Sequence, residues 1–210
     1  NGDYESKITY YQTTGSTQSP AFTYIDGNWM NLGSMQLGLR IIPTFGDLNG
    51  DGIRDMIIGK GDGRLTYSIG TSSSFNISTI PLQDENNQVI QVGGFAFPQL
   101  YDLNSDGLLD LIIGNAQGKL FYYKNVGSQT QPRFRLITDE LGGINLQLLD
   151  GDRGYLAPHF FRHNNTTYLF CGHTEGQLMY YNNIDNNIDG TFTLVDANYL
   201  GLTVEGYSSF

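Results

Sequence analysis

Two short stretches of the chain carry the side chains and the spacing that a hard divalent cation requires. The first places Asp47, Asn49, Asp51, Gly52 and Asp55 within nine residues, and the same pattern returns 55 residues later. Ca²⁺ takes roughly six to eight oxygen ligands, which alternate residues of a tight turn can present together. The glycine at the sixth position supplies a backbone conformation that other residues resist. The two stretches therefore predict two calcium loops.

Each predicted ion has a set of side-chain ligands and one backbone carbonyl. For the first ion these are the side chains of Asp47, Asn49, Asp51 and Asp55 and the carbonyl of Ile53. For the second ion they are the side chains of Asp102, Asn104, Asp106 and Asp110 and the carbonyl of Leu108. A plain turn would explain one stretch rich in Asp, Asn and Gly. It explains less well two stretches with identical spacing, each followed by an apolar segment.

The loops differ from EF-hand loops in their second halves. An EF-hand needs a bidentate Glu at position 12 and a helix on each side. Position 12 is Ile58 in the first loop and Ile113 in the second, and each lies in a short, β-branched apolar run. Such runs favour strands over helices.

The composition is that of an all-β protein. The 210 residues include 27 Gly and 13% aromatic residues, with only 15% charged residues. The net charge of −10 disfavours nucleic acid or an anionic membrane as a partner. A single cysteine, Cys171, excludes an internal disulfide framework, and no apolar run is long enough to span a membrane. The polar opening residues do not resemble a signal peptide, and we expect the chain to be a piece of a longer precursor.

The sequence repeats with a period typical of propeller or solenoid proteins. Four related segments are expected at residues 1–42, 43–97, 98–157 and 158–205, and a fifth begins at 206–210. In residues 98–157 the pattern predicts four strands, at about 95–101, 109–114, 119–125 and 134–138. Leu120 and Tyr122 should face one side of the sheet, and Phe121 and Tyr123 the other. A four-stranded antiparallel unit that cannot bury both faces must stack on its neighbours, as a propeller blade does.

The stretch from Phe45 to Asp55, followed by Met56-Ile57-Ile58-Gly59, resembles the FG-GAP or VCBS-type repeat. Such repeats form the propellers of integrin α-subunits and occur in many secreted bacterial proteins. The resemblance extends over most of the chain, most strongly at residues 43–70 and 98–137. It implies a β-propeller of four-stranded blades, with a calcium loop between the first and second strands. The first segment has only two expected strands, so we expect part of a larger ring, with a closed four-blade ring as the alternative.

The third full segment departs from the pattern. Arg162 stands where the first Asp of the loop should be, and Tyr168 replaces the last. A cation and no carboxylate cannot hold Ca²⁺, so we expect no ion there. The stretch 185–190 imitates the start of a calcium loop, but its alignment favours a hairpin turn. His159, His163 and His173 lack the helical setting that would make His159 and His163 a zinc pair.

These observations predict a calcium-stabilised binding, adhesion or scaffold module of a secreted or cell-surface protein. Its partner would be a protein or a glycan, together with further blades or domains of the same precursor. The alternative class is a propeller-type polysaccharide lyase or hydrolase, although no nucleophile dyad or carboxylate pair can be recognised. An activity assay on a panel of polysaccharides would separate the two classes.

Overall fold

The computed structural model describes residues 6–35, 37–146, 154–173 and 176–202, and this part of the chain is all-β. A two-stranded N-terminal hairpin pairs β1 (Tyr10–Thr13) with β2 (Phe22–Asp26). Three four-stranded antiparallel sheets follow, each with its strands in chain order. Three short 3₁₀ segments, η1 (Trp29–Met35), η2 (Leu141–Gly143) and η3 (Tyr199–Gly201), follow the last strands of the hairpin, the second sheet and the third sheet.

We name the three sheets I, II and III. Sheet I contains β3 (Ile42–Gly46), β4 (Asp55–Gly59), β5 (Leu65–Gly70) and β6 (Phe75–Pro81). Sheet II contains β7 (Phe97–Tyr101), β8 (Asp110–Gly114), β9 (Leu120–Asn125) and β10 (Phe134–Thr138). Sheet III contains β11 (Ala157–His163), β12 (Thr166–Gly172), β13 (Leu178–Asn182) and β14 (Thr193–Asp196).

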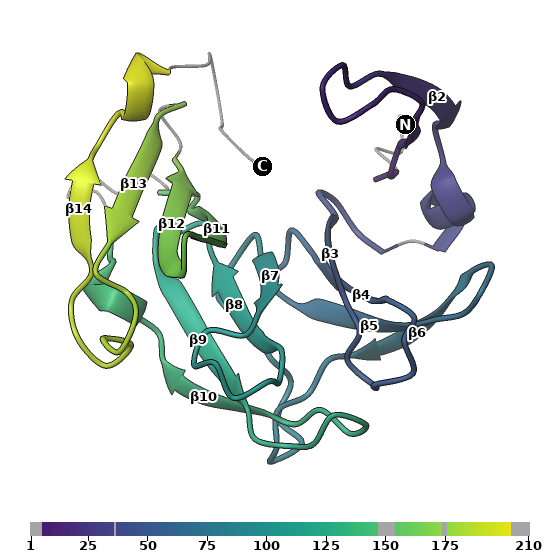
Figure 1. The fold of residues 1–210 in the computed structure, drawn as a ribbon. Helices are drawn as coiled ribbons and strands as arrows, with labels where there is room; N and C mark the ends of the chain where they lie inside the picture. The colour runs from purple at the N-terminus through teal and green to yellow at the C-terminus, as the bar shows by residue number, and fades with distance from the viewer. Residues whose placement is uncertain (1–5, 36, 147–153, 174–175, 203–210) are drawn as a thin grey trace.

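The sheets follow one another in an open arc that does not close on itself (Figure 1). Sheet II lies between the other two, because alternate residues of its strands enter two different cores. Leu111 and Ile113 of β8 belong to the core shared with sheet I, whereas Ile112 belongs to the core shared with sheet III. The expected alternation on β9 is confirmed, since Leu120 and Tyr122 face sheet III while Phe121 and Tyr123 face sheet I.

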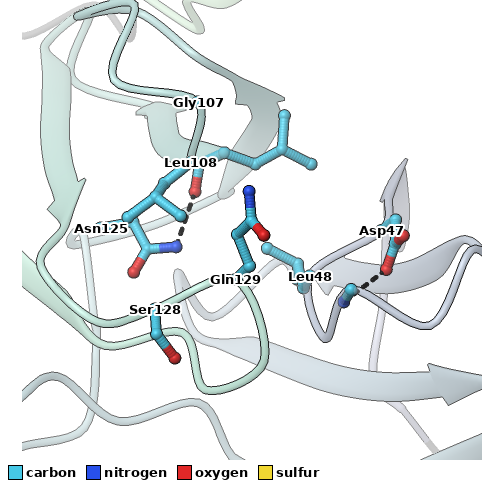
Figure 2. A pocket seen from close by; sticks show the side chains of 9 residues that line it. Asp47, Leu48, Gly107, Leu108, Asn125, Ser128 and Gln129 are labelled. Carbon is cyan, nitrogen blue, oxygen red and sulfur yellow. Dashed lines mark hydrogen bonds between the residues drawn. The ribbon is translucent and has the colours of Figure 1, made fainter.

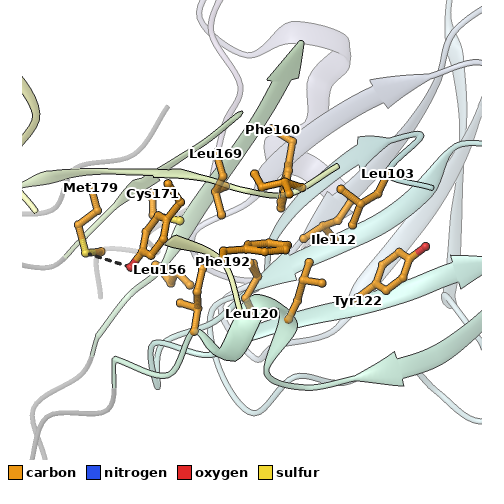
Figure 3. Close-up of a cluster of buried hydrophobic side chains, with 14 residues drawn as sticks. Leu103, Ile112, Leu120, Tyr122, Leu156, Phe160, Leu169, Cys171, Met179 and Phe192 are labelled. Atoms are coloured by element: carbon orange, nitrogen blue, oxygen red, sulfur yellow. Dashed lines mark hydrogen bonds between the residues drawn. The ribbon is translucent and has the colours of Figure 1, made fainter. Parts of the chain in front are cut away.

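The core between sheets II and III is built from large apolar side chains on facing strands (Figure 3). Phe160 of β11 and Leu169 of β12 lie against Ile112 and Leu120 of sheet II. Cys171 belongs to the same core and is fully buried. Burying each such side chain contributes about 1.5–3 kcal/mol, so the sheets stabilise one another by their faces.

The first strands of the three sheets are neighbours, with β7 between β3 and β11. Side chains connect them to the next backbone: the N–H of Leu100 donates to Oγ1 of Thr44 at 3.1 Å. The Gln99 side chain accepts from the N–H of Phe160 at 2.6 Å and donates to its carbonyl at 2.8 Å. Thr44 and Gln99 each follow a proline at the same strand position, so the contact repeats with the sheets.

The N-terminal hairpin is exposed on both strands, and an aromatic cluster beyond it contacts sheet I. Trp29 of η1 lies 5.8 Å from Tyr10, 6.3 Å from Phe45 and 5.6 Å from Phe75, measured between ring centroids. No helix among the described residues is long and apolar enough to cross a membrane. The fifth segment expected at residues 206–210 lies outside the described residues.

Candidate metal centre

Both acidic stretches lie where the resemblance implied, between the first and second strands of a sheet. The first acidic loop (47–55) joins β3 to β4, and the second acidic loop (102–110) joins β7 to β8. The sixth-position glycines, Gly52 and Gly107, have φ of +84° and +85°. A Cβ at either position would meet no atom within 4 Å, so backbone conformation alone requires glycine there.

In the first acidic loop the side-chain oxygens accept hydrogen bonds from backbone N–H groups of the same loop. Asp47 accepts hydrogen bonds from the N–H groups of Gly50 at 2.8 Å and Gly52 at 2.9 Å. Asn49 accepts from the N–H of Asp51 at 3.0 Å, and Asp51 in turn accepts from the N–H of Ile53 at 2.8 Å. The oxygens at positions 1, 3 and 5 are therefore held on a tight turn.

The second acidic loop repeats most of this arrangement, but one N–H that the opening aspartate accepts comes from Asp106, one position later than Gly50 in the first loop. Asp102 accepts from the N–H groups of Asp106 at 3.1 Å and Gly107 at 2.9 Å. Asn104 accepts from the N–H of Asp106 at 2.9 Å, and Asp106 accepts from the N–H of Leu108 at 3.0 Å. This loop also has a nearby cation, because the Lys124 ammonium lies 3.3 Å from Asp106.

The aspartates at position 9 have a different setting, since Asp55 and Asp110 are both completely buried. The carboxylate of Asp110 accepts from the N–H of Leu103 at 3.2 Å, the N–H of Asn125 at 2.8 Å and the hydroxyl of Tyr122 at 2.9 Å. It thus ties the loop, the start of β8 and the end of β9 together. Burial raises the pKa of Asp110 to about 6, against the lowering effect of these hydrogen bonds.

Asp55 makes the equivalent connections in sheet I. It accepts from the N–H groups of Leu48 and Gly70, each at 2.9 Å, and hydrogen-bonds the hydroxyl of Tyr67. Burial and the charge of Asp55 raise the pKa of Tyr67 well above its usual value. Tyr67 and Tyr122 occupy the same position on the third strand of their sheets, so the pairing of tyrosine and aspartate repeats. The sequence pattern placed Tyr122 on one face of its strand but did not predict either hydrogen bond between tyrosine and aspartate.

The candidate side chains suit Ca²⁺ chemically, because each of them offers an oxygen atom as a ligand and none contains sulfur. A carboxylate has about four lone-pair sites, so an oxygen that accepts one N–H can still bind a cation. Among the described residues, no group of three or more His, Cys, Asp or Glu side chains is close enough to hold a metal as positioned. Ligation by the aspartates of either loop would therefore require their side chains to lie closer together than they do here.

Sheet III has a two-residue turn where the acidic loop would be. Asn164 and Asn165 connect β11 to β12 with φ of +48° and +60°, a conformation that Asn tolerates well and that suits a hairpin. The repeat pattern predicts the second strand of this segment at residues 169–172, whereas strand β12 begins at Thr166 because the turn is so short. The guanidinium of Arg162 donates to the carbonyl of Asn165 at 3.2 Å.

A carboxylate from another part of the chain performs the tying role in sheet III. Asp185, just after β13, accepts from the N–H of Thr167 at 2.9 Å and from its hydroxyl at 2.7 Å. The start of the second strand is thus connected to the end of the third, as in the other two sheets. The hairpin expected at 185–190 is confirmed, since these residues join β13 to β14. Tyr168 stands where the other two sheets have the last aspartate of the loop. That missing aspartate was the one sequence signal that another carboxylate, here Asp185, makes the contact.

Each acidic loop lies close to a neighbouring sheet. A hollow of about 290 Å³ separates the first acidic loop from Leu108 and Leu109 of the second and from the turn at Ser128 and Gln129 (Figure 2). A similar hollow of about 270 Å³ lies between Asn104 of the second loop and Arg162 and Asp185 of sheet III. Each of these hollows is thus lined by an acidic loop and by residues of a neighbouring sheet.

A scan against protein-family models found no match to this sequence, and a search of curated proteins found none either. The resemblance to FG-GAP and VCBS-type repeats accordingly rests on the residues of the acidic loops and on the repeated strand pattern.

Proposed function

We propose that this chain is a segment of a calcium-stabilised β-propeller of the FG-GAP or VCBS type. It would act as a binding, adhesion or scaffold module of a larger secreted or cell-surface protein. Three successive four-stranded antiparallel sheets that pack face to face support the propeller part of this proposal. The open arc and the two-stranded hairpin at its start support a partial ring.

The observation that carries the calcium part is the closely similar folding of the two acidic loops. In each, the opening aspartate (Asp47 or Asp102) accepts two backbone N–H groups of its own loop. The side chains at positions 3 and 5 cap the turn in the same order. Two loops 55 residues apart that share spacing, glycine conformation and three of these hydrogen bonds are better explained by a shared ligand than by turn preference alone.

The ligands predicted from the sequence were the side chains at positions 1, 3, 5 and 9 of each loop and the carbonyls of Ile53 and Leu108. The carbonyls remain proposed ligands, whereas the position-9 aspartates, Asp55 and Asp110, are buried and already accept hydrogen bonds from the sheet. The carboxylates of Asp47 and Asp51, with Asn49, would hold the first ion, and those of Asp102 and Asp106, with Asn104, the second. A bound Ca²⁺ supplies the positive charge that lets these carboxylates lie close together. Asp55 and Asp110 connect each loop to its sheet. One carboxylate oxygen of each accepts a hydrogen bond from the backbone at the end of the third strand, from Gly70 and Asn125 respectively.

An extracellular setting follows from the affinity expected of such loops. Extracellular calcium modules commonly bind with Kd of about 10⁻⁴–10⁻³ M, which suits a calcium-rich exterior. The partner would be a protein or a glycan bound at the loops of the ring. Because such loops vary between proteins that share a fold, the partner must be identified by binding experiments.

Isothermal titration calorimetry of chelator-treated protein tests the calcium assignment directly. We expect Ca²⁺ binding at millimolar or tighter Kd, with a rise in the melting temperature on adding calcium. The double variant Asp47→Asn with Asp102→Asn should lose most of both effects. Asp62→Asn, in an exposed turn outside both acidic loops, removes one charge elsewhere and should change neither. An unaltered melting temperature in millimolar calcium, without heat of binding, would refute the assignment.

A further inference from the structure

The two acidic loops differ in the residue that follows their asparagine. In the first loop Asn49 is followed by Gly50, whereas in the second loop Asn104 is followed by Ser105. The amide carbon of an asparagine side chain can be attacked by the backbone nitrogen of the next residue. Glycine favours this attack, because it has no Cβ to crowd the nitrogen and its backbone turns freely. The contacts of each loop show where the reaction can proceed.

In the first loop a carboxylate contacts the nitrogen that would attack. The N–H of Gly50 donates to Oδ1 of Asp47 at 2.8 Å. The attack must release the proton of this N–H, so an acceptor that already contacts it can act as the general base. Gly50 is exposed to solvent and has φ of +71°, a conformation that suits glycine. The nucleophile, its base and water are therefore all present at this residue.

The side chain of Asn49 is held through its oxygen alone. Its Oδ1 accepts the N–H of Asp51 at 3.0 Å. A donor at this oxygen stabilises the negative charge that develops on it when the amide carbon is attacked. Among the described residues, none accepts a hydrogen bond from the amide nitrogen of Asn49. The NH₂ group that must depart is therefore unrestrained.

The second loop lacks these advantages. Asp102 accepts the N–H groups of Asp106 and Gly107, and neither of these hydrogen bonds comes from the nitrogen of Ser105. The amide nitrogen of Asn104 donates to Oδ2 of Asp106 at 2.9 Å, which restrains the group that would depart. Ser105 also carries a Cβ next to the nitrogen that would attack. The second loop is thus a control for the first within the same chain.

From this geometry we infer that Asn49 deamidates by itself, with Gly50 as nucleophile and Asp47 as base, while Asn104 is preserved. The nitrogen of Gly50 bonds to Cγ of Asn49 and gives its proton to Asp47, which returns a proton to the departing NH₂ group. The bond between Cγ and the amide nitrogen breaks, ammonia leaves and a cyclic succinimide remains. Water then opens the ring at either carbonyl, which leaves aspartate or isoaspartate at position 49.

Isoaspartate would disturb the first loop, because the main chain then passes through the side-chain carbon and becomes longer. Gly50 has little room for such a change. A Cβ at this residue would lie 2.9 Å from the carbonyl oxygen of Gln129, in the turn between β9 and β10 of sheet II. We therefore expect deamidated protein to melt at a lower temperature than fresh protein.

Peptide mapping by mass spectrometry measures the reaction directly. Trypsin cleaves after Arg40 and Arg54, and Asn49 is the only asparagine or glutamine between them. The replacement of NH₂ by OH in that peptide, after incubation of the folded full chain in chelator at neutral pH, therefore reports on Asn49 alone. Fragment ions of the tryptic peptide 65–119 report on Asn104 in the same sample. We expect Asn49 to convert about tenfold faster than Asn104, or more.

Two variants separate the role of Asp47 from the charge of the loop. Asp47→Ser removes the base at Gly50 and should slow the conversion of Asn49 by about tenfold or more. Asp51→Ser is the matched control, because its carboxylate belongs to the same loop but accepts the N–H of Ile53. This control should leave the rate unchanged.

Two results would overturn the inference. These are equal rates at Asn49 and Asn104 in the folded protein, and equal rates at Asn49 in Asp47→Ser and Asp51→Ser. Each variant must first show the circular dichroism and melting temperature of the parent protein in chelator. If Asp47→Ser fails this check, the comparison of Asn49 with Asn104 in the parent protein decides alone.

One further expectation rests on the proposed calcium function. Ca²⁺ in the first loop would bind the oxygens of Asp47 and Asn49 that the reaction uses, so saturating calcium should slow the deamidation of Asn49. Fast conversion in chelator with an equal rate in calcium would count against the calcium assignment and would leave the inference about Asn49 standing. The failure of one proposal is thus distinguishable from the failure of the other.

Discussion

Removal of the Asp110 carboxylate should destabilise the protein even when no calcium is present. The side chain is completely buried and accepts three hydrogen bonds, from the backbone of Leu103 and Asn125 and from the hydroxyl of Tyr122. In Asp110→Ala these three groups lose their acceptor inside the protein. Each unsatisfied buried group costs about 1–3 kcal/mol, and the tyrosine hydroxyl can turn toward another acceptor. We therefore expect the free energy of unfolding to fall by roughly 3–5 kcal/mol.

Urea unfolding followed by circular dichroism, in excess chelator, isolates this effect from any loss of ion binding. Asp110→Asn should be intermediate, because the amide retains one acceptor oxygen and turns an NH₂ group toward a donor. Asp106→Ala is the matched control: its side chain is partly exposed at the loop surface, where an ion pair contributes about 1 kcal/mol or less. If Asp110→Ala and Asp106→Ala lose equal stability in chelator, the buried carboxylate does not connect the loop to the sheet.

Three further outcomes follow from the contacts described above. Asp185→Ala should lower the free energy of unfolding by about 2 kcal/mol through the two hydrogen bonds that Asp185 accepts from the start of β12, equally with and without calcium; a calcium-dependent loss would contradict a purely structural role. Gly114→Ala should cost about 3 kcal/mol or more in urea unfolding, because its Cβ would lie 1.9 Å from the carbonyl oxygen of Leu156. Gly94→Ala, with its nearest contact at 3.7 Å, should cost much less, and similar losses would refute the close approach of the two sheets. Cys171 is fully buried and burial raises its pKa, so thiol reagents should modify it only at the rate of unfolding; rapid labelling of the native protein would show an open core.

The strand pattern was largely predictable because it depends on local signals. Alternation along Leu120 to Tyr123 predicted two buried faces, and the structure places those residues in two cores. The strand expected at 134–138 has those bounds, since a proline-containing turn precedes it. The start of β12 was predicted too late, because Asn164 and Asn165 close a turn far tighter than the loop used for alignment.

Long-range partners could not be read from spacing. Asp185 mimics the opening of a calcium loop, yet its carboxylate replaces the missing aspartate of another strand. The hydrogen-bonded contact is kept in space, but the carboxylate that makes it comes from a different position in the repeat. Alignment of the repeats therefore does not reveal it. Arg40 and Phe95 likewise lie 55 residues apart and meet only because sheet I stacks on sheet II.

The amino-acid sequence by itself determined the repeat, the period-two strands and the paired acidic loops, because each depends on residues within a few positions of one another. Tertiary structure alone decided which oxygens of the loops face solvent and which are buried. At Asp110 the same residue type and spacing that predict a ligand also provide the acceptor for three buried donors. That second role arises because the loop, β8 and β9 converge on one carboxylate, and such convergence depends on how the strands pair and pack.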